Sequence, residues 1–450
     1  MPIRKHVLAM AFPAFGHYIA MMELAKRIVP HHDVTVVISD TRREEIRQRH
    51  LVPPAPIGFH TVDDHVSERI DENFTDLRVL INIIESAKPY YNHFISMLNT
   101  DNSPLPFVDA IFCDITQHSP CDAIIAKGIP LYIVNVLPTF LMAKAFTIQE
   151  DTPTVPDETF FKDEVDGTKA ADLPVQESIK TLAFGHHHNC KGARAMLFNS
   201  FAELEPGALE AFQQNPRTKD KILKYIGPLT TPSDSAVDND GLAEKIMQWM
   251  DKQKERSVVY FSLGSIAVIS KEQTVQIANA LMSLNRPFVW SLRPFLQVHL
   301  PEGMKGQSAD SFNPDSKYLI IPWTPQKRIL SHKATALFVS HCGWNSTLET
   351  VSFGVPIVAW PMFGDQHFNA VLVEQVGIGL KVKGTGMLNK KAVPASEIVD
   401  AIETVAGWKS GDVEQTAFAK EMKYMGEKAR EAVGENGPST KSLLEILDAI

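Results

Sequence analysis

A histidine and an aspartate stand where proton-transfer chemistry would need them, close to the ends of two predicted buried strands. His17 follows the apolar run His6–Phe12 and precedes a predicted helix, whereas Asp114 closes the run Val108–Asp114. The carboxyl ends of parallel strands meet at one edge of a sheet, so we expect the two side chains to lie together. A neutral imidazole can take a proton from a hydroxyl, and a carboxylate on its other nitrogen would fix its orientation. The alternative is a purely structural histidine.

A second set of polar residues surrounds the turn His341–Asn345, which follows another predicted buried strand, Ala336–Ser340. We expect a helix to begin at Ser346. A strand, a turn that contains glycine and a helix N-terminus together form an anion site, because unpaired N–H groups and the helix dipole face the ligand. The alternative is an ordinary capped helix, since Ser346 and Glu349 fit the capping box S-x-x-E.

Residues on either side of this turn favour a nucleotide-sugar ligand. Trp323 lies in a loop between two prolines, and an indole in such a loop offers a flat face to a base, a stacking contact of ~1–3 kcal/mol. Gln326 follows closely enough to reach a ribose hydroxyl. Asp365 and Gln366 come after the predicted strand Val355–Trp360, and their side chains can hydrogen-bond to adjacent sugar hydroxyls.

The segment Trp323–Gln366 resembles, without a gap, the signature box of the plant-type UDP-glycosyltransferases, which form family 1 of the inverting glycosyltransferases. Weaker resemblance extends through three other segments, Ser257–Ser265, Pro287–Pro294 and Met196–Glu205, while Ala143–His188 matches poorly. The resemblance implies an α/β protein of the GT-B fold, in which two doubly wound Rossmann-like domains face a central cleft. It also implies His17 as the general base, with Asp114 as its support.

The resemblance assigns the donor site as well, with UDP-glucose as the co-substrate. Trp344 together with Gln366 resembles the glucose-preferring members, in which histidine at the last position goes with galactose. The implied contacts are Trp323 to uracil, Gln326 and Glu349 to the ribose, His341, Asn345 and Ser346 to the diphosphate, and Trp344, Asp365 and Gln366 to the sugar, with Ser265, Thr324 and Gly343 completing the set.

Length and charge limit the kind of protein. The 450 residues exceed one ordinary core, so two domains are expected. Lys and Arg total 44 against 53 Asp and Glu, a formal net charge of −9, and no stretch is basic enough to follow nucleic acid or an anionic membrane. No segment approaches ~20 uninterrupted apolar residues. These observations predict that the protein binds neither nucleic acid nor a membrane. The partners that the resemblance implies are a UDP-sugar and a small-molecule acceptor, and we expect a monomer.

Cysteine usage and one sequon favour the cytoplasm. The N-terminal apolar run indicates a strand rather than a signal peptide, because it breaks at Pro13 and no small-residue cleavage site follows. Asn345-Ser346-Thr347 is an N-x-[ST] sequon on the predicted phosphate loop, and passage through the secretory pathway would risk its modification. No C-x-x-C pair occurs, which predicts reduced thiols at Cys113, Cys121, Cys190 and Cys342.

Predicted strands and helices alternate on both sides of a segment rich in Pro, Ser, Asp and Gly, residues 228–241. Such alternation predicts parallel sheets flanked by helices, with ligands at the carboxyl ends of the strands. We predict an acceptor-binding domain at 1–232, a linker at 233–241, a UDP-sugar-binding domain at 242–425, and C-terminal helices at 426–450 that pack back on the first domain.

Together with these patterns, the resemblance implies inverting transfer of glucose from UDP-glucose to a hydroxyl of a small lipophilic or phenolic acceptor. No G-x-G-x-x-G follows a strand, and neither a P-loop nor a G-x-S-x-G elbow occurs. Donors at the diphosphate replace a metal, so we expect no metal and no permanently bound cofactor; the consecutive His186, His187 and His188 cannot all face one ion. A UDP-sugar epimerase and a silent nucleotide-sugar sensor remain alternatives, and a base that activates an acceptor distinguishes them. Apolar candidates for the acceptor pocket are Phe12, Phe15, Leu80, Ile84, Leu137, Phe140 and Phe184.

Overall fold

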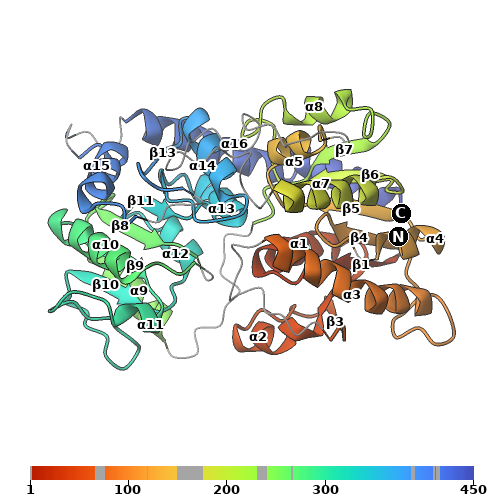
Figure 1. Ribbon diagram of the computed structural model, residues 1–450, viewed down its shortest axis with the longest axis horizontal. Coiled ribbons are helices and arrows are strands. Elements are labelled where there is room, and N and C mark those ends of the chain that lie inside the picture. Colours follow the sequence, from red (N-terminus) through yellow and green to blue (C-terminus); the bar gives the residue numbers. More distant parts are fainter. Residues whose placement is uncertain are drawn as a thin grey trace. The chain divides into compact units, whose positions relative to one another are not determined.

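Buried strands alternate with helices along the chain, and in the computed structural model they form two units, each built around its own sheet (Figure 1). The first unit contains Met1–Thr230 and Ala429–Ile450, and the second contains Thr231–Lys428. Most of the predicted linker, 233–241, lies outside the described residues, and so does Ser265. The structure describes residues 3–65, 77–118, 120–148, 176–230, 241–264, 267–386, 391–408, 411 and 416–450.

The first unit runs from the N-terminal strand to β7 and then gains one helix from the end of the chain. Its elements are β1 (His6–Met10), α1 (Phe15–Ile28), β2 (Asp33–Ser39), the 3₁₀ helix η1 (Asp40–Arg42), α2 (Arg43–Gln48), β3 (Gly58–Val62), α3 (Leu77–Met97), β4 (Ala110–Asp114), α4 (Cys121–Ala126), β5 (Leu131–Asn135), α5 (Thr139–Ala145), α7 (Gln176–Cys190), β6 (Ala195–Phe198), α8 (Ala208–Gln214), β7 (Ile222–Tyr225) and α17 (Pro438–Asp448).

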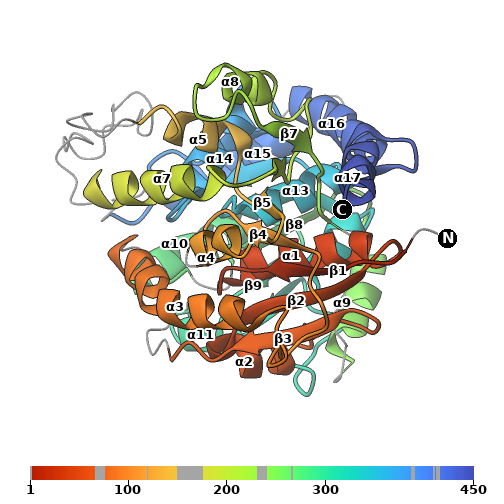
Figure 2. The same ribbon diagram turned by 90° about the vertical axis from the view of Figure 1, so that its right-hand side faces the viewer.

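The strands of the first unit form one parallel sheet, whose order within the described residues is β3-β2-β1-β4-β5-β6-β7. Figure 2 shows β3, β2, β1, β4 and β5 following one another from bottom to top. Val7 of β1 pairs with Val34 of β2 on one side and with Ala110 of β4 on the other. The strand order therefore reverses at β1, and a ligand site is expected at such a switch point, outside the carboxyl ends of the strands.

The second unit repeats this plan around the parallel sheet β10-β9-β8-β11-β12-β13. Its order reverses at β8, which pairs with β9 on one side and β11 on the other. The elements are α9 (Leu242–Asp251), β8 (Val258–Ser262), α10 (Lys271–Ser283), β9 (Phe288–Ser291), α11 (Pro294–Gln297), β10 (Tyr318–Ile321), α12 (Gln326–Ser331), β11 (Thr335–Ser340), α13 (Trp344–Phe353), β12 (Ile357–Ala359), α14 (Gln366–Gln375), β13 (Gly379–Lys381), α15 (Ala395–Ala406) and α16 (Ala417–Val433), which crosses the boundary into the first unit.

Both faces of the second sheet are covered by helices. Alternate residues of a strand point to opposite faces, so Val259 and Phe261 pack into one apolar cluster with α10 and α15. Val258 and Tyr260 pack into another with α9 and α12. Burial on both faces explains why these strands read as continuous apolar runs rather than as an alternation.

The last helix belongs to the first unit. α17 packs against β7, and its residues Leu443, Ile446 and Leu447 join the apolar core formed by α1 and the first sheet. The carbonyl of Leu447 also accepts a hydrogen bond from His32 Nε2 at 3.1 Å. Residues of α17 thus complete the apolar core that is formed by α1 and the first sheet.

Some elements differ from the sequence prediction. The strand predicted at Val355–Trp360 is limited to Ile357–Ala359. Neither β3 nor β13 was predicted. The strand β3 is only half-buried over most of its length and mixes polar with apolar residues, and β13 has 3 residues. Neither segment carries a pattern long enough to indicate a strand.

Candidate active site

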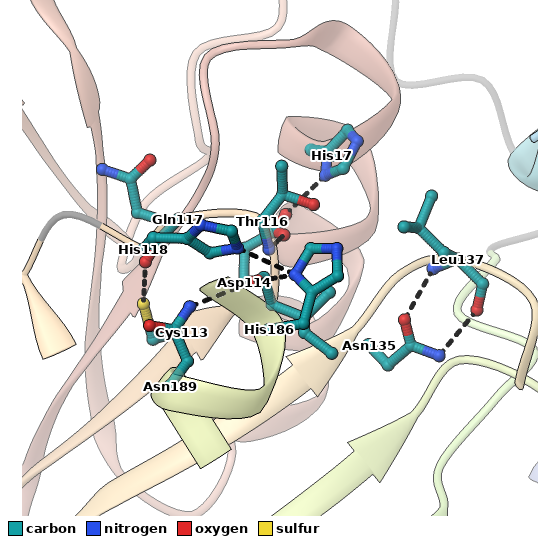
Figure 3. Close-up of polar contacts among 11 residues, drawn as sticks. His17, Cys113, Asp114, Thr116, Gln117, His118, Asn135, Leu137, His186 and Asn189 are labelled. Carbon is teal, nitrogen blue, oxygen red and sulfur yellow. Dashed lines mark hydrogen bonds and ion pairs between the residues drawn. The ribbon is translucent and has the colours of Figure 1, made fainter. Parts of the chain in front are cut away.

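His17 and Asp114 are hydrogen-bonded to each other at the carboxyl edge of the first sheet (Figure 3). The distance from His17 Nδ1 to Asp114 Oδ2 is 2.8 Å. Asp114 is the last residue of β4 and its side chain is fully buried, while 16% of the His17 side chain is exposed. One detail of the prediction is wrong, because α1 begins at Phe15 and His17 therefore lies inside the first helical turn rather than before it.

Further contacts hold both side chains of this pair. A carboxylate can only accept, so the neutral His17 ring carries its proton on Nδ1 and its lone pair on Nε2. The other carboxylate oxygen, Asp114 Oδ1, accepts the main-chain N–H of Thr116 at 2.8 Å. Phe12 lies edge-on to the imidazole, with ring centroids 5.4 Å apart and planes at 66°. The ring is therefore held in one orientation, as a general base requires.

In the second unit, the loop after β11 leads directly into α13. Cys342 has a left-handed φ of 60°, and Gly343 is the residue before the helix. The helix begins at Trp344, two positions before the predicted start at Ser346, and no side chain caps it. The capping-box alternative, with Ser346 as the cap and Glu349 as its partner, is therefore wrong. An N-terminus without a side-chain cap directs main-chain N–H groups and the helix dipole toward an anion.

His341 packs between two glycines at this loop. A Cβ added to Gly343 would lie 2.6 Å from His341 Nε2, and one added to Gly264 would lie 2.9 Å from it. Burial lowers the pKa of His341 to about 4, against a smaller opposite effect from the main chain of Ser262. The imidazole is consequently neutral at neutral pH and can donate a single N–H to a ligand.

The residues predicted for base and ribose surround this loop. Trp323 is 54% exposed, so its indole is accessible for stacking. Gln326 Nε2 donates to Glu349 Oε2 at 2.7 Å and to Ser346 Oγ at 3.1 Å. Lys327 Nζ lies 3.9 Å from the other Glu349 oxygen. The structure thus brings Gln326, Ser346 and Glu349 together, as a ribose–diphosphate site requires.

Tyr260, on β8, belongs to the same network but was not identified from the sequence. Its hydroxyl lies 2.8 Å from Thr324 Oγ1 and 3.4 Å from Gln326 Oε1. A buried tyrosine needs a hydrogen-bond partner for its hydroxyl, so a polar contact could be expected. The identity of that partner could not, because Thr324 is 64 positions away in the sequence.

The residues predicted to bind the sugar lie at the start of α14. Gln366 Oε1 accepts two main-chain N–H groups of the preceding loop, at 2.9 and 3.1 Å, which fixes the direction of its NH₂ group. Asn369 Nδ2 donates to the carbonyl of Cys342 at 2.7 Å and to Asp365 Oδ2 at 2.6 Å. Asn369, which sequence reasoning missed, therefore ties the loop after β11 to the predicted sugar ligand Asp365.

Two other predicted donor residues lie in the first turn of α13. The Trp344 side chain is buried, with 3% exposed, so its indole offers no accessible face to a sugar and a contact there would come from the main chain. Asn345 follows it and is partly buried.

A cavity of 590 Å³ lies in the first unit, lined mainly by α3 and α7. Of the residues predicted for an apolar acceptor pocket, Ile84 and Phe184 line it. Ile84 belongs to the same apolar cluster as Phe12, the ring that lies against His17, so this cavity wall and the ring beside the imidazole are parts of one cluster.

Phe15 is not part of this cavity and lies under the guanidinium groups of Arg42 and Arg49. The cavity lining also includes Ile81, Leu182, Glu85, Lys88, His118, Asp122, Thr181, Gly185, His187, His188, Asn189, Lys191 and Arg217.

The three consecutive histidines of α7 point to different partners. His186 Nδ1 contacts the carbonyl of Ile115, His187 Nε2 that of Ala145, and His188 Nε2 the carboxylate of Asp122. Over the residues that the structure describes, no group of three or more His, Cys, Asp or Glu side chains could hold a metal ion. The four cysteines are free and buried. Within the same described residues, no helix is both long enough and apolar enough to cross a membrane.

The chain is similar to known sugar transferases along its whole length. Residues 222–409 match the family described as UDP-glucoronosyl and UDP-glucosyl transferase. The UDP-glucosyltransferase 102 of Panax ginseng is 27% identical, over 100% of both chains. The anthocyanidin 3-O-glucosyltransferase of Solanum melongena is 36% identical, over 58% of this chain and 55% of its own.

The fold is shared with solved structures of the same kind. A UDP-glucosyltransferase from Polygonum tinctorium that glucosylates indoxyl superimposes with a TM-score of 0.77 at 22% identity, over 99% of this chain and 98% of that one. The region that matches the family model contains every residue predicted for the donor site, while His17 and Asp114 lie within the part aligned to the full-length relatives. Residues 222–409 therefore carry the UDP-glucoronosyl and UDP-glucosyl transferase domain, and the chain is a glycosyltransferase of the GT-B fold that is similar along its whole length to plant UDP-glycosyltransferases.

Proposed function

We propose that this enzyme transfers glucose from UDP-glucose to a hydroxyl of a small aromatic or other lipophilic acceptor, with inversion at the anomeric carbon and with His17 as the general base. The observation that carries the proposal is the 2.8 Å hydrogen bond between His17 and Asp114. An imidazole oriented by a buried carboxylate is suited to activating an incoming hydroxyl. Neither an epimerase nor a nucleotide-sugar sensor needs such a group for an acceptor.

In the proposed reaction, His17 Nε2 takes the acceptor proton while the acceptor oxygen attacks the anomeric carbon. The bond from that carbon to the UDP oxygen breaks, so the α-linked donor gives a β-linked product. Asp114 stabilises the imidazolium that forms and keeps the proton on Nδ1. A hydroxyl is a poor nucleophile until its proton is removed, so this step is where the base contributes most.

The leaving UDP would be held by the loop after β11 and the start of α13. Main-chain N–H groups at the start of this 10-residue helix and the N–H of neutral His341 supply charge stabilisation to the diphosphate. Trp323 would stack on uracil, and the Gln326–Glu349 pair would bind the ribose. We propose that the reaction needs no metal ion, because these donors carry out the charge stabilisation.

Glucose is the proposed sugar. The relatives from Panax ginseng and Polygonum tinctorium are glucosyltransferases by name, and Trp344 with Gln366 follows the glucose-preferring pattern. Asp365 is held by Asn369 at 2.6 Å, and the Gln366 amide is fixed by two main-chain contacts. Both side chains are thereby positioned for adjacent sugar hydroxyls.

The proposed acceptor is a flat aromatic molecule. The Solanum melongena relative is named for an anthocyanidin and the Polygonum tinctorium protein for indoxyl, both aromatic compounds. The cavity beside α7 has room for such a ring, with apolar contacts from Ile81, Ile84 and Phe184. We propose that the acceptor ring binds there, since Ile84 on that wall belongs to the same apolar cluster as Phe12, which lies against His17.

We also propose that the enzyme acts in the cytoplasm as a monomer. The sequon Asn345-Ser346-Thr347 lies in the first turn of α13, where a glycan would block the proposed diphosphate site. One chain supplies both the base and the donor residues, so a single copy has all the groups that the reaction requires. Size-exclusion chromatography with light scattering tests the monomer.

Competition among donors tests the proposal as a whole. The enzyme is incubated with equal UDP-glucose, UDP-galactose and UDP-glucuronic acid and with a panel of phenols and aliphatic alcohols. We expect a mass gain of one hexose on phenols, glucose as the incorporated sugar, and a β-anomeric proton coupling in the product. An α-linked product, or another sugar incorporated first, would overturn the corresponding part of the proposal.

A further inference from the structure

Helix α7 holds the loop that follows β4. His186 Nδ1 lies 3.1 Å from the carbonyl of Ile115, and Asn189 Nδ2 donates to the same carbonyl at 3.2 Å (Figure 3). The two side chains are three positions apart and so share one face of the helix. His118, at the other end of the loop, places its Nε2 2.8 Å from His186 Nδ1. Both ends of loop 115–118 are therefore attached to α7.

The direction of these hydrogen bonds follows from the chemistry of the partners. A carbonyl only accepts, so His186 carries a proton on Nδ1 and His118 Nε2 acts as an acceptor. Burial lowers the pKa of His186 to about 4 and holds the pKa of His118 well below its usual value. Both rings are neutral at neutral pH. In that state His186 Nδ1 can be the donor, and the Ile115 carbonyl and His118 Nε2 can be its two acceptors.

Gly185 allows His118 to approach the helix. A Cβ added at this position would lie 2.2 Å from His118 Nδ1 and Cε1, a distance at which the ring would have to move. The two imidazoles meet edge to face, with centroids 4.7 Å apart and planes at 84°. No larger residue at 185 is compatible with this position of the ring.

The loop held in this way is the one that orients Asp114. Ile115 is the next residue after it, and the N–H of Gln117 donates to the Asp114 carbonyl at 2.9 Å. The N–H of Thr116 donates to Asp114 Oδ1 at 2.8 Å, which leaves Oδ2 for His17. A displacement of loop 115–118 would therefore turn the carboxylate and, with it, the imidazole of His17.

We propose that Gly185, His186 and His118, here called the α7 clamp, are positioning residues of the transfer reaction. They hold loop 115–118 so that Asp114 presents one oxygen to Thr116 and the other to His17. The proposal rests on His17 as the base, and it assigns the clamp no contact with the reacting atoms.

The test compares two substitutions of His186, which does not line the cavity. His186→Phe removes the Nδ1 donor, whereas His186→Asn keeps an amide N–H close to its place. A displacement of about 1 Å at a catalytic group costs roughly 10²-fold, so we expect kcat of His186→Phe to fall by about 10- to 100-fold. The KM for acceptor and the affinity for UDP should stay within about twofold, and His186→Asn should regain most of kcat.

A matched control separates positioning from stability. His32 is a buried histidine of the same unit, bonded to the main chain of Lys5 and Leu447, at the opposite edge of the sheet. His32→Phe should lower Tm and leave kcat per folded molecule unchanged. If His186→Phe behaves in the same way, or if His186→Asn is as slow as His186→Phe, the α7 clamp has no positioning role.

Substitutions of two glycines and of His17 test the α7 clamp further. Gly185→Ala keeps every polar group but displaces His118, so it should also lower kcat. Gly192→Ala, whose Cβ would meet the side chain of Ile125 at 2.3 Å from Cδ1 and 2.5 Å from Cγ1, should not. His17→Ala is measured beside them. An active His17→Ala would contradict the proposed base itself, whereas an inactive His17→Ala with normal turnover in His186→Phe would contradict only the clamp.

Discussion

The two sheets each place a histidine next to their switch point, and the surroundings of these histidines differ. His17 follows β1 and donates a hydrogen bond from Nδ1 to the buried carboxylate of Asp114 at 2.8 Å. His341 follows β11 and packs against Gly264 and Gly343, where burial lowers its pKa to about 4. The first environment suits a group that must become charged during the reaction, and the second suits one that must stay neutral and donate. The strand order therefore places a histidine next to each switch point, and the groups around each ring determine whether it becomes charged or stays neutral.

The first prediction tests the base and carries the largest expected effect. His17→Ala should lower turnover by ~10²–10⁴-fold, the usual contribution of a positioned base, while UDP affinity stays unchanged because the donor residues lie in the other unit. The loss should be smallest for acidic phenols, which are already partly ionised. Turnover against acceptor pKa, with UDP affinity by calorimetry alongside, checks this; equal rates for both proteins across the series would remove His17 from the mechanism.

Removing the carboxylate should do less harm than removing the imidazole. Asp114→Asn keeps the His17 ring in place but orients it poorly, so we expect a loss of about 10²-fold or less, the order that misplacement of a catalytic group costs. UDP affinity should again be unaffected. Turnover measured beside His17→Ala decides the order, and a variant as slow as His17→Ala would mean that orientation is as important as the base itself.

A third prediction addresses the donor side of the comparison. Trp323→Ala should weaken UDP binding by about 5- to 150-fold, which corresponds to a stacking contact of ~1–3 kcal/mol, and should leave kcat at saturating donor close to normal. Its side chain is already 54% exposed, so Tm should change little. Calorimetric titration with UDP measures the effect; unchanged affinity would place uracil elsewhere.

The buried neutral histidines predict acid sensitivity in both units. Burial lowers the pKa of His186 and of His341 to about 4. The pKa of histidine in an unfolded chain is about 6.5. The unfolded state therefore binds more protons between these values, so stability is full above about pH 6.5 and decreases as pH falls toward about 4. Tm across this range checks the trend, and His186→Asn should flatten it. A constant Tm would show that these rings become protonated without unfolding.

Removal of metal ions should have no effect on turnover. Because helix N–H groups and His341 stabilise the diphosphate in our proposal, turnover in excess EDTA should equal turnover without it. The control adds Mg²⁺ back after chelation. Loss of activity that Mg²⁺ restores would contradict the assignment of charge stabilisation to α13 and His341.

Much of the site was predictable because the carboxyl ends of parallel strands converge. That rule was sufficient to pair His17 with Asp114, although they are 97 positions apart. The start of α13 was not predictable, since the left-handed φ of Cys342 has no signature in a sequence that also fits a capping box. Tyr260, Asn369 and the α7 clamp were missed for another reason: each acts through a partner distant in sequence, and only the folded chain shows which partner that is.

The packing of α17 also has a consequence for synthesis. A ribosome releases the N-terminal part of a chain first, so β1 to β7 emerge long before Leu443, Ile446 and Leu447, which complete their core. The apolar surface that α17 covers must stay uncovered while the entire second unit is translated. A stop codon just before Pro438 would consequently leave the second unit intact and remove α17 from the core of the first unit. The apolar surface exposed in this way would be accessible to chaperones and proteases.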